Sequence, residues 1–332
     1  MAKFYIEAYG SALSGKTVFI ACREGVLRDH FNAIITDIKF LNRYGIRTTL
    51  FHNMSNRFAN QKHFRHLASR LPDTTIIRVN SDTDFYDVVL DYPENASKLI
   101  FLERKYLIDH ENQRINSLTT EATRNKINTY GDLIANINFK NVLERICLKI
   151  DEGSYDRVHI LAAGKCVIKR ELFTIEGSGT LIANNFTETF SQVSTDDEVN
   201  IVFGILDMYR IEGFLKPRSR EYVSENRGNF FVTRIDDIIV GSVEKKIIDP
   251  ETVELGALAI STKFRNQRVG VYTVAAFFSE MAAKGYRRFV SLTNNPKLET
   301  LYNTFGFVQQ SLPRYQHRQE QSPGVKMFYK QI

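Results

Sequence analysis

The stretch from Glu254 to Phe307 constrains the fold more than any other part of the chain. An alternating apolar run, ELGALAIS, predicts a strand, which leads through the basic turn TKFRNQ into the helical pattern RVGVYTVAAFFSEMAAKG. YRRFVSLT predicts a second strand, and NPKLETLYNTFGF predicts a short helix that ends at a glycine. Because a basic turn that opens a helix directs backbone N–H groups and the helix N-terminus at one place, this stretch predicts an anion site.

The turn resembles the pyrophosphate loop of the GNAT acyltransferase superfamily, and LYNTFGF resembles the closing helix of that superfamily. The resemblance implies an α+β acetyltransferase domain whose loop amides hold the pyrophosphate of acetyl-CoA, while a splayed strand receives the pantetheine arm. Arg268 stands where the loop pattern has its first glycine, and Gly270 fills the second position. The alternative for the turn is a solvated helix cap. The residues that the resemblance places against acetyl-CoA are Leu258, Ala259, Ile260, Arg265, Asn266, Gln267, Arg268, Val269, Gly270 and Val271.

Two residues of this stretch are candidates for proton transfer. Acyl transfer from a thioester needs a neutral amine and a proton for the departing thiolate, and these groups titrate at about pH 10 and about pH 8.5. Glu254 is the acid-base candidate for the amine, and Tyr302, where GNAT enzymes often place a tyrosine, is the candidate donor to the CoA sulfur. The amide of Leu258 or a neighbour would polarise the carbonyl. The alternatives are a solvated strand-end carboxylate and a core aromatic.

Residues from about 16 to 182 alternate strand and helix patterns, as in a parallel α/β sheet. RVNSDT, KLIFLERKYLIDHENQRI and, most specifically, ELFTIEGSGT resemble the amino-acid kinase fold of acetylglutamate kinases and of the kinase-like domain of N-acetylglutamate synthases. The resemblance implies a three-layer α/β domain built on a parallel sheet.

The residues that a kinase of this fold needs for phosphate binding are missing. Such a kinase carries a lysine and glycines after the first strand, whereas this chain has Ala21-Cys22-Arg23-Glu24, and the carboxylate would repel a nucleotide. We therefore expect a shortened, non-catalytic domain with a regulatory or architectural role. In arginine-regulated relatives the ELFT-x-x-G-x-G-T ending contributes to the inhibitor site, which implies that Glu171, Gly177 and Gly179 contact an L-arginine effector. The alternative is a loop with positive φ, which glycine tolerates.

The domain limits follow from these segments: a kinase-like domain over 1–183, a polar linker over 184–198 and an acetyltransferase domain over 199–332. This order resembles bacterial N-acetylglutamate synthases, which transfer acetyl from acetyl-CoA to the α-amine of L-glutamate at the start of arginine biosynthesis. Arginine forks grip carboxylates bidentately. The candidate substrate-binding residues are Arg218, Arg220, Asn294, Asn295 and Arg318.

Other functions stay open at this point. One alternative is a GNAT enzyme that acts on another amino acid, a polyamine or a protein lysine, with the first domain as a sensor. Another is a non-catalytic module that only binds effectors, which the missing loop glycine favours and the presence of Glu254 and Tyr302 disfavours.

Composition limits the partners and the compartment. The net charge of +6 is modest and spread along the chain, and no basic-aromatic motif indicates nucleic-acid binding. Cys22, Cys147 and Cys166 are too widely spaced to predict a disulfide framework or a metal site. Because no apolar run has the length of a membrane span and the N-terminus lacks a signal pattern, we expect a cytoplasmic protein without a membrane partner. By resemblance to the relatives, we expect a homo-oligomer.

Overall fold

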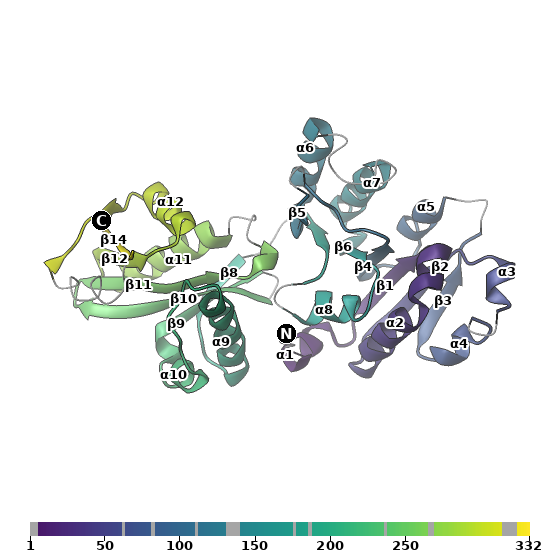
Figure 1. Ribbon diagram of the computed structural model, residues 1–332, viewed down its shortest axis with the longest axis horizontal. Coiled ribbons are helices and arrows are strands. Elements are labelled where there is room, and N and C mark those ends of the chain that lie inside the picture. Colours follow the sequence, from purple (N-terminus) through teal and green to yellow (C-terminus); the bar gives the residue numbers. More distant parts are fainter. Residues whose placement is uncertain are drawn as a thin grey trace. The chain divides into compact units, whose positions relative to one another are not determined.

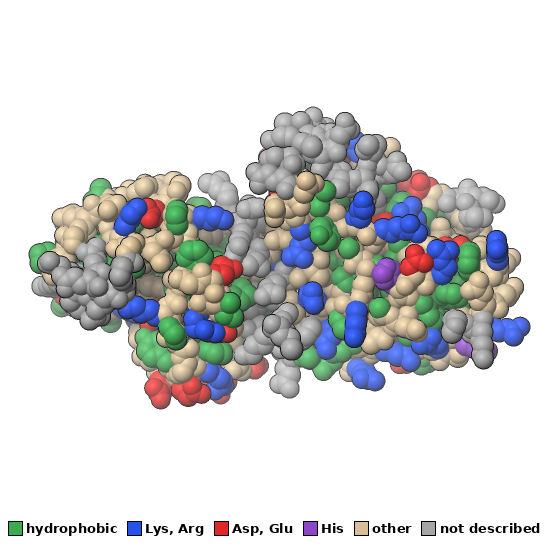
Figure 2. All heavy atoms as spheres, viewed as in Figure 1, with side chains coloured by type: hydrophobic (Ala, Val, Ile, Leu, Met, Phe, Trp, Pro, Cys, Tyr) green, Lys and Arg blue, Asp and Glu red, His purple; other side chains and the backbone are tan. Residues whose placement is uncertain are grey.

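The chain divides into two compact units, Met1–Phe186 and Thr187–Ile332, each of which combines helices with one sheet (Figure 1). The computed structural model describes residues 6–61, 64–80, 84–109, 112–130, 140–174, 177–184, 188–235, 238–264, 269–313 and 324–332. Among these residues, no helix combines the length and the apolar character that a bilayer crossing requires. On the face drawn in Figure 2, basic and acidic side chains are interspersed over both units.

The sheet of the first unit has the strand order β3-β2-β1-β4-β6-β7-β5. Its strands are β1 (Thr17–Cys22), β2 (Arg47–His52), β3 (Thr74–Arg78), β4 (Ala96–Glu103), β5 (Ser117–Thr119), β6 (Tyr155–Ala162) and β7 (Thr180–Ala183). The five strands from β3 to β6 in this order are parallel, as predicted, and β7 runs antiparallel to β6. The central strands are buried on both faces, which explains their continuous apolar sequences.

Helices pack on both faces of this sheet and make the predicted three layers (Figure 1). On one face lie α1 (Ile6–Leu13), α2 (Glu24–Arg43) and α8 (Val167–Phe173), joined by an edge-to-face contact between Phe40 and Phe173. On the other lie α5 (Phe85–Leu90), α6 (Thr120–Tyr130) and α7 (Lys140–Asp151), which cover a core that includes Phe19 and Phe101. The short helices α3 (Asn56–Ala59) and α4 (Leu67–Arg70) lie between β2 and β3 in the chain.

The sheet of the second unit has the order β13-β14-β12-β11-β10-β9-β8 and is antiparallel except for the pair β11 and β12. Its strands are β8 (Glu188–Gln192), β9 (Phe230–Ile235), β10 (Ile238–Asp249), β11 (Thr252–Ile260), β12 (Arg288–Thr293), β13 (Val308–Gln309) and β14 (Lys326–Gln331). The predicted order of strand, turn, helix, strand and helix after Glu254 agrees with β11, α11 (Val269–Ala283), β12 and α12 (Pro296–Thr304).

Helices cover both faces of the second sheet as well. Glu244 of β10 contacts the segment that begins α10 (Arg220–Glu225), whereas a Cβ added to Gly241 would point toward Thr273 of α11. Because positions 241 and 244 have opposite parity on one strand, α10 and α11 lie on opposite faces. Figure 1 shows α9 (Asp196–Ile211) on the face of α10 and α12 on the face of α11.

The segment 184–198, predicted as an exposed linker, is structured over most of its length. Glu188–Gln192 form β8, which pairs with β9 and stacks Phe190 on Phe231 with ring centroids 5.4 Å apart. An edge strand with one solvated face carries mostly polar residues, so its sequence resembles that of a loop. The acidic cluster that was expected to end the linker begins α9 instead, where Thr195 and Glu198 form a capping box.

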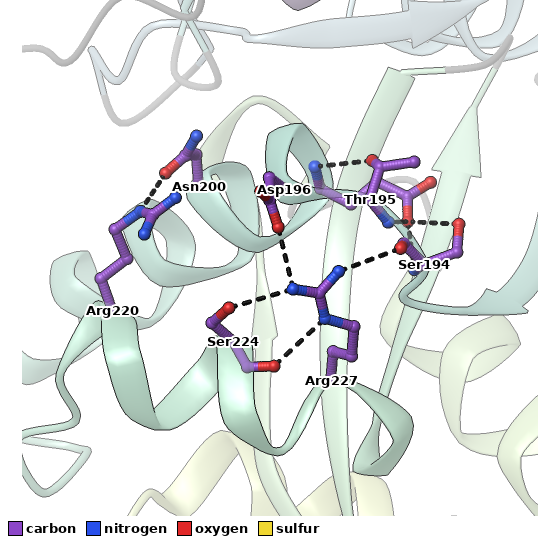
Figure 3. Close-up of polar contacts among 8 residues, drawn as sticks. Ser194, Thr195, Asp196, Asn200, Arg220, Ser224 and Arg227 are labelled. Carbon is purple, nitrogen blue, oxygen red and sulfur yellow. Dashed lines mark hydrogen bonds and ion pairs between the residues drawn. The ribbon is translucent and has the colours of Figure 1, made fainter.

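Arg227 links the start of α9 to the end of α10. Arg227 lies in the short 3-10 helix Arg227–Asn229 and donates to Oδ1 of Asp196 at 2.9 Å. It also donates to the backbone oxygens of Ser194 and Ser224, as Figure 3 shows. These bonds fix the position of α9, which leads into the segment that carries Arg218.

Candidate active site

The strands β11 and β12 separate part-way along their length. They pair in parallel only from Thr252 to Glu254, opposite Arg288 to Val290. Beyond this point β12 continues its pairing with β14, and Ser291 donates its hydroxyl to the backbone oxygen of Leu255 at 2.9 Å. Among the described residues, the last part of β11 therefore has no strand partner on its β12 side, which leaves a backbone edge open to a ligand.

A β-bulge lies at the point of separation. Ser242 of β10 pairs with Ala259, whereas Glu244 pairs with Gly256, so two residues of β11 stand opposite one residue of β10. Ala257 within this bulge has φ +48°, in the left-handed region that few residues other than glycine adopt. Bulges of this kind redirect a strand and the side chains on it, and they are frequent beside active sites.

The predicted CoA-binding residues lie around this opening as far as they are described. Leu258, Ala259 and Ile260 are buried on β11. Val269, Gly270 and Val271 form the first turn of α11, and a Cβ added to Gly270 would lie 3.8 Å from Ile260. The end of β11 and the start of α11 are thus in contact. Arg265, Asn266, Gln267 and Arg268 lie outside the described residues.

Glu254 lies on β11 where the strands separate, and it is buried with only 2% of its surface exposed. Lys246 of β10 places its Nζ 3.6 Å from Oε1 of Glu254 and 3.8 Å from Oε2 of Glu244. Glu254 is therefore not a solvated strand-end carboxylate. It belongs to a row of three charged side chains on one face of neighbouring strands.

Glu244, which sequence reasoning missed, is 1% exposed and binds several donors. Arg218 donates from Nη2 at 2.7 Å and from Nε at 3.1 Å to one carboxylate oxygen, and the hydroxyl of Tyr222 donates to the other at 2.6 Å. Burial and the bond to Glu244 raise the pKa of Tyr222 to about 12. The sequence offered one signal for this role, because Glu244 is the one acidic residue in the predicted strand segment GSVEKKI and a carboxylate is seldom buried unless it is paired.

The predicted substrate-binding arginines are bound within the protein where they are described. Arg218 uses two nitrogens on Glu244, and Arg220 donates from Nε to Oδ1 of Asn200 at 2.6 Å (Figure 3). A substrate carboxylate would have to share these arginines or replace their present partners. Their substrate role stays a prediction, and Arg318 lies outside the described residues.

The two predicted asparagines differ in their surroundings. Asn294 is exposed, whereas Asn295 is buried and caps α12, because its Oδ1 accepts from the backbone N–H of Lys297 at 3.0 Å. Asn295 thus has a structural role as a helix cap, and its contact with substrate stays a prediction. Asn before Pro is a common start of a helix, since proline fits its first turn.

Tyr302 lies on α12 with 1% of its surface exposed, and its hydroxyl is hydrogen-bonded to Ser291. Burial raises the pKa of Tyr302 well above its ordinary value of 10, and the negative charge of Glu254 raises it further. The charge of Glu254 also raises the pKa of Tyr222, although it is the smallest contribution there. Two phenols that stay protonated therefore lie within electrostatic reach of one carboxylate.

The residues predicted to bind an arginine effector form a clamp in the first unit. Oε2 of Glu171 accepts from the backbone N–H groups of Ser178 and Gly179 at 2.6 and 3.0 Å, and Oε1 lies 2.8 Å from Nδ1 of His159. Gly177 has φ +62°, and a Cβ at Gly179 would lie 2.4 Å from a backbone oxygen of β6. Local packing therefore accounts for both glycines, and contact with arginine stays a prediction.

Comparison with known proteins bears on both units. Residues 199–307 match the model of the acetyltransferase (GNAT) family. The second unit is a GNAT acetyltransferase domain. The whole chain is similar to the crystal structure of N-acetylglutamate synthase from Neisseria gonorrhoeae complexed with coenzyme A and L-arginine, with a TM-score of 0.53 and 16% identity over 99% of this chain and 98% of that one. This similarity shows a shared two-unit fold.

Curated relatives match a smaller part of the chain. An amino-acid acetyltransferase from Pseudomonas fluorescens (strain SBW25) is 25% identical over 224 residues, which are 66% of this chain and 50% of that protein. One from Azotobacter vinelandii is 28% identical over 127 residues, 37% of this chain and 28% of that protein. The chain thus spans half the length, or less, of these curated relatives.

Proposed function

We propose that this protein is an N-acetyltransferase that uses acetyl-CoA to acetylate the α-amine of an amino acid, with L-glutamate as the first candidate. That reaction would open arginine biosynthesis. The observation that carries the proposal is the position of Glu254, a buried carboxylate at the point where β11 and β12 separate. Tyr302 of α12 lies within electrostatic reach of it.

The proposed roles follow from the chemistry of amide formation. The acceptor nitrogen attacks the thioester carbonyl carbon, the carbon–sulfur bond breaks, and the amine proton passes to Glu254 directly or through water. The open edge of β11, at Leu258 or a neighbour, offers a backbone N–H to the carbonyl oxygen. Tyr302, a phenol held protonated by burial, supplies the proton for the departing thiolate. Direct attack in a ternary complex needs no covalent enzyme intermediate.

A second candidate acceptor is a polyamine or a protein lysine. The bonds between Arg218 and Glu244 favour it, because an arginine that is bound by an internal carboxylate is less available to a substrate carboxylate. Glu244 and Glu254 together would suit a cationic acceptor. The two candidates therefore differ in the sign of charge that the acceptor pocket recognises.

A thiol-release assay with acetyl-CoA tests both candidates. Each amine of a panel with glutamate, other amino acids, spermidine and a lysine peptide is offered to the full chain. Activity on glutamate supports the first candidate, and activity confined to spermidine or peptide lysine supports the second. Release without any added amine would indicate hydrolysis of acetyl-CoA, and no release with any amine of the panel would indicate a non-catalytic module. Tyr302→Phe should lower turnover by about 10- to 100-fold if Tyr302 is the proton donor.

For the first unit we propose a regulatory or architectural role. Its chain carries Arg23 and Glu24 at the start of α2, where a kinase of this fold would need glycines for phosphate. The same assay with added L-arginine tests an effector role, since inhibition or activation would require a binding site on the chain. Analytical ultracentrifugation tests the homo-oligomer that we expect.

A further inference from the structure

The open edge of β11 has a side-chain partner that the sequence did not indicate. Tyr209, near the end of α9, donates its hydroxyl to the backbone oxygen of Ile260 at 2.9 Å and accepts from the backbone N–H of Ile260 at 3.3 Å. One phenol thus binds both polar backbone groups of one residue at the end of the strand. Backbone groups at an open edge need such partners.

The direction of these backbone groups follows from the sheet. Ser261, the next residue, donates its N–H to the backbone oxygen of Val240 on β10. Successive residues of a strand direct their backbone groups to opposite edges, so the N–H and C=O of Ile260 point away from β10 and toward the side on which β12 has separated. Tyr209 therefore binds the edge that borders the opening.

The pantetheine arm of CoA would need the same edge. Such an arm contains two amides, each with one N–H donor and one C=O acceptor, so it binds an open strand as an added strand would. Ile260 is the last residue of β11, and a Cβ at Gly270, in the first turn of α11, would lie 3.8 Å from it. An arm that runs from the loop before α11 toward Glu254 must pass Ile260.

We propose that Tyr209 competes with the pantetheine arm of CoA for the backbone of Ile260, and that binding of CoA displaces the hydroxyl. This inference rests on the proposed function. The hydroxyl offers one donor and one acceptor, as an amide of the arm does, and the two sets of bonds exclude each other. The hydroxyl thus lowers the affinity for CoA by the strength of the bonds that it makes to Ile260.

Calorimetric titration of the full chain with CoA tests this competition. Tyr209→Phe removes the hydroxyl and keeps the ring, so it should lower the Kd for CoA by about three- to tenfold, the effect of one net hydrogen bond. Tyr209→Leu, which also lacks the hydroxyl, should likewise lower the Kd for CoA. Agreement between the two variants excludes a folding defect of one of them as the cause. Tyr329→Phe is the matched control, because that hydroxyl bonds Gln331 on β14, and its Kd should equal the wild-type value.

The outcomes separate this inference from the proposed function. If wild-type protein binds CoA and neither Tyr209 variant binds it more tightly, the competition is refuted while the proposed function stands. Weaker binding by Tyr209→Phe would mean that the hydroxyl contacts the bound cofactor, which also overturns the inference. If wild-type protein shows no heat of binding at millimolar CoA, both proposals fail.

Discussion

Asp37 should make the stability of the first unit fall as the pH rises. This carboxylate of α2 is 2% exposed, and it accepts from the backbone N–H groups of Ile168, at 2.9 Å, and Lys169 at the start of α8. Burial raises its pKa from 3.8 to about 6, although the two N–H bonds and the charge of Lys169 act in the opposite direction. Removal of its charge by Asp37→Asn should therefore abolish a pH dependence of stability.

The sign and the size follow from proton linkage. Between pH 3.8 and about 6 the folded chain keeps a proton that the unfolded chain has lost, so stability falls as the pH rises. A shift of about two pKa units corresponds to about 3 kcal/mol. The stabilising contribution is fully present below pH 3.8 and is lost above the folded pKa. Asn keeps an oxygen that can accept one N–H bond and has no charge to bury.

Urea unfolding of the full chain, followed by circular dichroism at about pH 4 and about pH 7, measures this effect. The free energy of unfolding of Asp37→Asn minus that of wild type should increase by about 2.4 kcal/mol between these two pH values, because pH 4 already lies slightly above the unfolded pKa. Asp73→Asn, which removes an exposed carboxylate of the same unit, controls for the general loss of negative charge. A difference for Asp37→Asn that stays constant or decreases as the pH rises would refute the reasoning.

Three further predictions concern stability and substrate binding. Burial lowers the pKa of His52 from 6.5 to about 4, so the contribution of His52 to stability falls by about 3 kcal/mol as the pH falls between these values. In the same assay, the stability of His52→Gln minus that of wild type should increase by this amount over that range. Glu244→Gln should raise KM for a cationic acceptor about tenfold in steady-state assays, because it removes one of the two buried carboxylates that would suit such an acceptor; an unchanged KM would refute this. Gly179→Ala should lower the free energy of unfolding by more than about 2 kcal/mol in urea unfolding, since its Cβ would lie 2.4 Å from a backbone oxygen. The control Gly164→Ala has open space around it and should change the free energy of unfolding by less than about 0.5 kcal/mol.

Local patterns predicted the parts of the site that depend on neighbouring residues in the chain. The order of β11, α11, β12 and α12 follows from hydrophobic periodicity over this short stretch, and this order brings Glu254 and Tyr302 within electrostatic reach of each other. Glu244 and Tyr209 were missed because their partners are distant in sequence. Arg218 lies 26 residues from Glu244, and Ile260 lies 51 residues from Tyr209. Such pairs appear only once the sheet has brought separate segments together.

The linker was mispredicted, and the capping role of Asn295 was missed, for local reasons. The polar strand β8 has one stacked aromatic, Phe190, and otherwise the composition of a loop. Asn295 precedes a proline, and the sequence already contained this helix-start signal.

The position of β8 determines where the second unit can be separated from the first. The family match begins at 199, yet β8 supplies the partner strand that covers the outer edge of β9 from Phe231 to Ile235. A shortened protein that starts at 199 would leave those N–H and C=O groups unpaired in a row, next to the apolar ring of Phe231 that Phe190 had covered. Such an uncovered strand is a template for pairing with other chains, so the protein that starts at 199 should precipitate. A protein that starts at 187 keeps β8, so the edge of β9 should stay covered.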